Sequence, residues 1–68
     1  MTNPTSLHTP NRFYVGDRVR KVGGSYEATG TIQAVFATRA GLIRYVFEFD
    51  SPPGLLHIFS GIQLEAVP

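Results

Sequence analysis

Glycine and proline interrupt the chain at short intervals from Phe13 onward, and β-branched and aromatic residues fill the segments between them. None of these segments shows a helical spacing of apolar residues over a useful length. Short apolar runs bounded by turn residues are typical of short β-strands joined by tight turns. The sequence therefore predicts an all-β domain.

Alternating side chains and turn residues place the strands. Four strands are expected at about Asp17 to Val22, Gly30 to Ala37, Leu42 to Asp50 and Leu55 to Phe59. The closing segment, Ile62 to Val67, is expected to form one helical turn and a fifth short strand. Five short strands within about 55 residues favour a compact barrel, because closure leaves fewer exposed edges than an open sheet.

The alternation also predicts which side chains share a face. The third strand has one apolar face, formed by Ile43, Tyr45, Phe47 and Phe49. Its other face is mostly charged and carries Arg44, Val46, Glu48 and Asp50. In the second strand, the residues expected on one common face are Ile32, Ala34 and Phe36.

Residues 1–12 are polar, contain two prolines and lack apolar periodicity, which predicts a disordered tail before a domain at 13–68. A folded chain this short buries only about 60 % of the surface that its unfolded form exposes. The chain has no cysteine, which excludes disulfides and thiolate metal sites. Nor do His8 and His57 suggest a metal site within one chain. Oligomerisation remains as the means of adding stability.

The formal net charge is only +1, although Arg12, Arg18, Arg20 and Lys21 form a modest cluster. Strong nucleic-acid binding is not expected, because it depends on the neutralisation of many phosphates. No apolar run reaches the roughly 20 residues that a membrane span needs. The N-terminal sequence also lacks the pattern of a signal peptide. A cytoplasmic protein without membrane contact is expected.

The segment 16–21, Gly-Asp-Arg-Val-Arg-Lys, predicts a turn followed by a strand. Gly16 permits an unusual backbone angle, Asp17 can cap the turn and Val19 supplies a core side chain. The segment resembles the opening of KOW-type and other SH3-like modules, so the expected fold is a small five-stranded SH3-like barrel. Lys21 is either a solvated lysine at a strand end or a charge directed at a ligand phosphate or carboxylate.

The segment Leu56-His57-Ile58-Phe59 is the leading candidate for a functional strand. If Leu56 and Ile58 enter the core, His57 and Phe59 project outward together. An exposed ring beside a histidine indicates either a face that binds a ligand or a face on which subunits pack. An ordinary interface histidine beside a packed phenylalanine is the simpler interpretation.

At this point the chain resembles a known family, the type II (plasmid-type, B-type) dihydrofolate reductases. The segment 16–21 matches intact, and the match continues without gaps over 45–59. The family's active-site strand reads Val-Gln-Ile-Tyr where this chain has 56–59. The resemblance covers most of 15–67. Identical positions within 45–59 are Tyr45, Glu48, Pro53, Gly54 and Ile58.

The resemblance implies a slow, NADPH-dependent reductase that converts dihydrofolate to tetrahydrofolate and resists the antibiotic trimethoprim. It implies a homotetramer of SH3-like barrels around one central pore, in which NADPH and dihydrofolate meet. Lys21, at the pore mouths, would attract the cofactor phosphates and the glutamate tail of the folate. His57, Ile58 and Phe59 would be the catalytic residues, and His57 and Ile58 would also contact the substrate. Leu56 would complete the cofactor-binding strand.

Two of these positions depart from the family pattern. His57 replaces a glutamine that lines the pore, and Phe59 lacks the hydroxyl of the family's tyrosine. Ile58 would offer its backbone N–H and C=O to the nicotinamide amide and the pterin. The carboxylates Glu48 and Asp50 are read as a solvated strand face, so the proton added to the pterin is expected from water.

Two alternatives stay open. The first is a non-enzymatic SH3-like or KOW-like module that contacts RNA, DNA or protein through Arg18, Arg20, Lys21 and Tyr26. The second is an oligomer with a different native role, because a fold does not determine a function.

Overall fold

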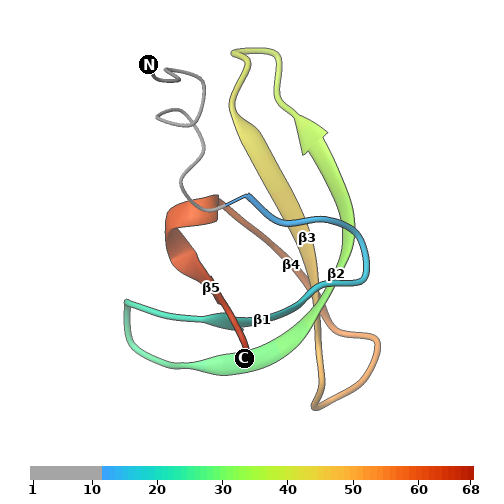
Figure 1. The fold of residues 1–68 in the computed structure, drawn as a ribbon, viewed down its shortest axis with the longest axis vertical. Coiled ribbons are helices and arrows are strands. Elements are labelled where there is room, and N and C mark those ends of the chain that lie inside the picture. The colour runs from blue at the N-terminus through green and yellow to red at the C-terminus, as the bar shows by residue number, and fades with distance from the viewer. Residues whose placement is uncertain (1–11) are drawn as a thin grey trace.

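A computed structural model describes residues 12–68, so the predicted tail at 1–12 lies, apart from Arg12, outside the described residues. The strands are β1 (Arg18–Lys21), β2 (Ala28–Ala37), β3 (Ile43–Phe49), β4 (Leu56–Phe59) and β5 (Leu64–Ala66), with a 3-10 turn η1 (Gly61–Gln63) before β5. All pairings are antiparallel, in the order β4-β3-β2-β1-β5 (Figure 1).

The predicted all-β class, its five strands and the closing turn before the last strand are confirmed. The hydrogen-bonded ladder ends at β4 on one side and at β5 on the other. Closure into a barrel therefore stays a prediction. Within residues 12–68, no helix is long and apolar enough to cross a membrane.

Aromatic rings of β3 form the centre of the core. Phe47 is completely buried, with Phe49 at 5.0 Å and Phe59 at 5.4 Å between ring centroids, both edge to face. Edge-to-face pairs of this kind add about 0.5–1.5 kcal/mol beyond the burial of their area. The predicted apolar face of β3 is buried at Tyr45, Phe47 and Phe49, whereas Ile43 remains exposed at the start of the strand.

β2 contains a bulge that changes its faces. Ile32 lies opposite Phe47, but Ala34 already lies opposite Val46, so Gln33 has no partner in the register. The extra residue reverses the alternation beyond it. The prediction that Ile32, Ala34 and Phe36 share one face is therefore wrong.

The faces of β4 are set by its register with β3. Phe59 lies opposite the core residue Tyr45 and is 6 % exposed, whereas Ile58 lies opposite Val46 and is 59 % exposed. The larger ring fills the core, so the predicted orientation of this strand is wrong. The core side of β4 carries His57 and Phe59, and its outer side carries Leu56 and Ile58.

The residues expected to build the first turn do so. The Asp17 carboxylate accepts a hydrogen bond from the backbone N–H of Tyr14 at 2.9 Å, and Val19 is fully buried. Gly30 lies where β2 meets β3. A Cβ at this position would collide with the backbone carbonyl of Glu48 and would lie 2.7 Å from the Phe47 ring.

We expect Gly30→Ala to destabilise the fold by about 3 kcal/mol, because neither a ladder carbonyl nor a core ring can move aside cheaply. Urea unfolding followed by far-UV circular dichroism measures the change. Gly41→Ala is the matched control, since Gly41 has a φ of 85° but open space around it. Its cost should stay near the 1–2 kcal/mol of a left-handed residue. A cost for Gly30→Ala no larger than that of the control would contradict the close approach.

Candidate functional site

The structure connects Lys21 with His57 through a row of rings. The Lys21 Nζ lies 4.1 Å from the centroid of the Tyr26 ring, which stacks on Phe49 at 6.5 Å. Phe49 in turn meets the His57 ring edge to face at 5.3 Å, and His57 lies 5.8 Å from Phe59. The ring row, defined as Tyr26, Phe49, His57 and Phe59, thus links the β1–β2 loop to β4.

β4 forms one of the two edges of the sheet, and Ile58 directs its backbone groups toward this edge. The Phe49 N–H donates to the Leu55 carbonyl at 2.9 Å, which identifies the hydrogen-bonded pairs of this ladder. Because such pairs alternate, His57 and Phe59 direct their backbone groups toward β3. Ile58, between them, directs its N–H and C=O away from the sheet.

An apolar line crosses the outer face next to this edge. Ala34, Val46 and Ile58 lie opposite one another on β2, β3 and β4. Leu56, also on β4, is exposed as well. An open strand edge beside exposed apolar side chains is a surface suited to pairing with another chain.

Lys21 is neither solvated nor directed outward. Its side chain is 5 % exposed, and Nζ donates to the carbonyls of Gly23 at 2.6 Å and Tyr26 at 3.1 Å. The amine is therefore occupied by the loop that follows β1. Its predicted role in binding phosphate stays a prediction that requires the amine to leave these partners.

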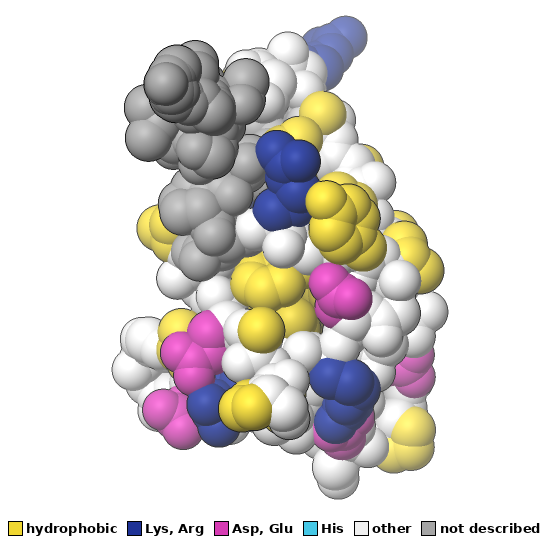
Figure 2. Space-filling model, in the orientation of Figure 1, with side chains coloured by type: hydrophobic (Ala, Val, Ile, Leu, Met, Phe, Trp, Pro, Cys, Tyr) yellow, Lys and Arg dark blue, Asp and Glu magenta, His cyan; other side chains and the backbone are white. Residues whose placement is uncertain are grey.

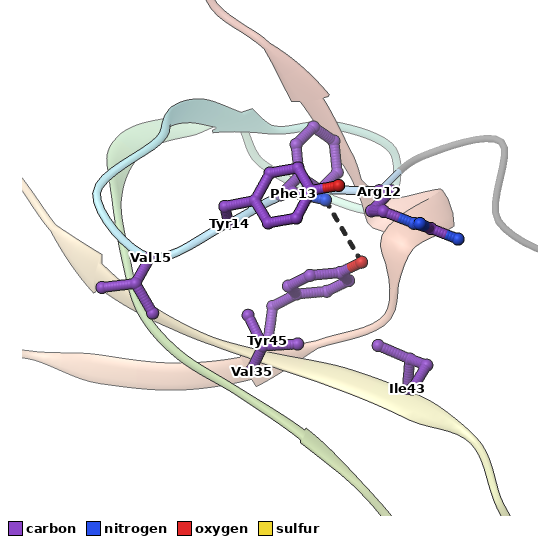
Figure 3. Close-up of a pocket in the computed structure, with 7 residues that line it drawn as sticks. All are labelled: Arg12, Phe13, Tyr14, Val15, Val35, Ile43 and Tyr45. Atoms are coloured by element: carbon purple, nitrogen blue, oxygen red, sulfur yellow. Dashed lines mark hydrogen bonds between the residues drawn. The ribbon is translucent and has the colours of Figure 1, made fainter.

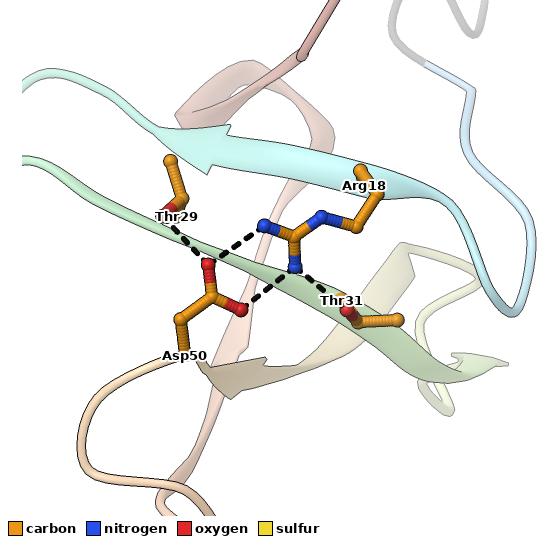
Figure 4. Close-up of polar contacts among 4 residues, drawn as sticks. All are labelled: Arg18, Thr29, Thr31 and Asp50. Carbon is orange, nitrogen blue, oxygen red and sulfur yellow. Dashed lines mark hydrogen bonds and ion pairs between the residues drawn. The ribbon is translucent and has the colours of Figure 1, made fainter.

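The basic cluster predicted from the sequence is largely neutralised. Arg18 donates to both carboxylate oxygens of Asp50 at 2.7 Å, and Thr29 and Thr31 complete the network (Figure 4). Arg20 likewise pairs with a carboxylate, that of Glu65, at 2.6 Å. In the lower half of Figure 2, basic side chains lie against acidic ones.

The predicted charged face of β3 is held by structural contacts. Glu48 accepts from the Gln33 side-chain amide at 2.7 Å and from the backbone N–H of Gly54 at 3.0 Å. One Glu48 oxygen thus contacts β2 and the other contacts the β3–β4 loop, so this side chain links the two. No pattern in the sequence connects Arg18 with Asp50, because only the folded sheet brings their strands together.

A cavity of about 430 Å³ was missed by the sequence interpretation (Figure 3). None of the predicted site residues lines it. The Tyr45 hydroxyl crosses one side and accepts from the Phe13 N–H at 3.3 Å. The exposed aromatic and aliphatic pair Tyr14 and Val15, just before the first turn, was the only signal for it. The lining residues are Arg12, Phe13, Tyr14, Val15, Val35, Ile43 and Tyr45.

Within residues 12–68, no group of three or more histidine, aspartate or glutamate side chains is placed to hold a metal ion. No protein-family model matches the chain, and no curated protein matches it.

The Arg18 hydrogen bond, followed by that from Thr29, lowers the pKa of Asp50 from 3.8 to about 2. A lowered folded-state pKa means that the ionised carboxylate stabilises the fold above about pH 4 and that this stabilisation is lost as the pH falls toward 2. We expect the urea midpoint of Asp50→Asn to fall less between pH 4 and pH 2 than that of the wild type. If the urea midpoint fell equally in both proteins, ionisation of Asp50 would not be a cause of the loss of stability between pH 4 and pH 2.

Proposed function

We propose that this chain is an NADPH-dependent dihydrofolate reductase that works as a homotetramer around one central pore. The observation that carries the proposal is the position of Ile58. Its backbone N–H and C=O lie on the open edge of a strand whose sequence aligns with the family's active-site strand. A carboxamide, such as that of nicotinamide, needs one donor and one acceptor side by side, and an unpaired strand edge provides them.

Assembly is supported by the surface around this edge. Leu56 and Ile58 expose apolar side chains on the outer face, and Val46 continues the same surface. Their burial between copies would contribute about 25 cal/mol per Å². Four β4 edges arranged around symmetry axes would enclose a pore in which each of these groups appears four times.

The chain's own residues would bind and orient two flat rings. NADPH, when bound, supplies the hydride that reduces the imine carbon of dihydrofolate. His57 is exposed between Phe49 and Phe59 in the ring row, where a neutral imidazole would offer one donor and one acceptor to a ring in the pore. Phe59 supports His57 from the core at 5.8 Å. Holding the rings in near-attack geometry can lower a barrier by about 7–11 kcal/mol in the best cases.

Water would supply the proton to the pterin. Glu48, the carboxylate opposite Leu56 in the ladder, already accepts hydrogen bonds at both oxygens. Glu48 is thus engaged by the protein and is not free to serve as a dedicated acid. A slow reaction that accelerates as the pH falls is the expected consequence.

The alternative of a non-enzymatic binding module has less support. Arg18 and Arg20 are engaged by Asp50 and Glu65, so two cations of the basic cluster are already paired with carboxylates and attract a polyanion less strongly. Weak retention on heparin, lost at moderate salt, is expected. Retention to high salt would favour the module over the reductase.

We expect the purified tetramer to oxidise NADPH in the presence of dihydrofolate, measured at 340 nm, with no inhibition by trimethoprim. Ile58→Pro should abolish turnover while the protein remains folded and tetrameric on size-exclusion chromatography. The reason is that the lost N–H points away from the sheet, where an edge strand tolerates proline. His57→Pro is the contrasting variant, since it removes a ladder hydrogen bond and should disrupt folding. Full activity in an assembled Ile58→Pro tetramer would contradict the proposal that the reaction depends on the Ile58 backbone in the pore.

Two substitutions at His57 test its role as a hydrogen-bonding group. His57→Gln keeps one donor and one acceptor and should retain turnover within a few-fold of the wild type. His57→Leu keeps the volume but not the polar atoms, and should lower kcat/KM by about tenfold or more, as expected for hydrogen bonds worth 1–2 kcal/mol. Similar kinetics for both variants would leave His57 with a packing role only.

A further inference from the structure

Lys21 has no donor left for a ligand in the resting structure. Its ammonium carries three N–H groups. Two of them reach the carbonyls of Gly23 and Tyr26, and the face of the Tyr26 ring covers Nζ at 4.1 Å. A phosphate can therefore reach this amine only after one of the three contacts is broken.

The β1–β2 loop is shaped to wrap around the amine. Gly23 and Gly24 both have positive φ angles, 77° and 69°, and these allow the chain to turn back over the end of β1. A Cβ on Gly24 would lie 2.9 Å from Nζ. The positive φ of Gly24 thus disfavours a larger residue, and a Cβ there would also require the Lys21 amine to shift.

Tyr26 provides the contacts that are easiest to release. It contributes two of the three, the longer carbonyl contact at 3.1 Å and the ring, whereas the Gly23 contact is 2.6 Å. Tyr26 is also 42 % exposed. Its ring stacks on Phe49, and Phe49 contacts His57, so a displacement of Tyr26 would remove a packing partner of the ring next to His57 on β4.

We propose that Tyr26 is a latch for Lys21: while closed it covers the amine, and when it moves aside the amine becomes available to a phosphate group. The inference rests on the proposed function, in which Lys21 draws in the cofactor phosphates. Tyr26 acts through Lys21 and is a positioning residue. Closing costs anion affinity, because each binding event must first break the contacts to the ring and its carbonyl.

The first test uses the fact that Lys21 is the only lysine in the sequence. Acylation by an amine-reactive ester, read by mass spectrometry, reports on Lys21 with the α-amino group of the same chain as internal reference. Tyr26→Leu should accelerate Lys21 acylation by about two- to fivefold, the effect of losing a cation–π contact to a partly exposed ring. Tyr26→Phe keeps the ring and should label like the wild type. Tyr14→Leu, the same change at another exposed tyrosine, should also leave the rate unchanged.

The second test measures anion binding with inorganic tripolyphosphate and with NADPH at low salt. Tyr26→Leu should bind both about two- to fivefold more tightly than Tyr26→Phe, and Lys21→Met should abolish the difference. Equal acylation rates in Tyr26→Leu and Tyr26→Phe would overturn the latch. Faster acylation without tighter tripolyphosphate binding would overturn its link to anions.

Failure of the reductase assignment is distinguishable from failure of the latch. The acylation and tripolyphosphate measurements require neither dihydrofolate nor turnover. If no NADPH oxidation were seen but both measurements gave the expected results, the reductase assignment would be rejected. The latch would still be supported, as a loop that controls access of anions to Lys21.

Discussion

The pairing of β3 with β4 is the constraint on which the candidate site depends. Phe59 is drawn into the core by the rings of Phe47 and Tyr45 on the neighbouring strand. Because strand side chains alternate, burial of Phe59 forces Ile58 outward. The same register turns the Ile58 backbone away from β3. Burial of the Phe59 ring in the core therefore leaves Ile58 with an exposed apolar side chain and with peptide groups that do not pair with β3.

Charge compensation separates the two classes of function considered for this chain. Arg18 is fixed on both sides, by Asp50 and by Thr31, and Arg20 is fixed by Glu65. These exposed pairs contribute little stability individually. Their larger effect is to remove positive charge from the surface that would otherwise attract a polyanion. The surfaces that remain for ligand contact include the open edge of β4 with the ring row behind it, and the cavity beside Tyr45.

Much of the strand pattern follows from local sequence. The alternation in β3 and the glycines between strands specify the elements, since both act through residues close in the chain. The orientation of β4 does not follow, because alternation defines two faces without saying which enters the core. Burial of Lys21 is equally hidden: it requires two carbonyls and a ring that only the folded loop brings to the amine. The partners of Arg18 and Arg20 lie far away in sequence, and no local pattern indicates them.

The bulge at Gln33 has a consequence for how the gene can vary. Ile32 and Val35 both face the core side although two residues separate them, because Gln33 stands outside the ladder. Loss of the residue at this position would shorten β2 by the bulge without exchanging its faces. The same deletion in a regular strand would move every residue beyond it to the opposite face. Gln33 itself has a structural role, because its side-chain amide donates to Glu48, and Glu48 also accepts from Gly54 in the loop before β4.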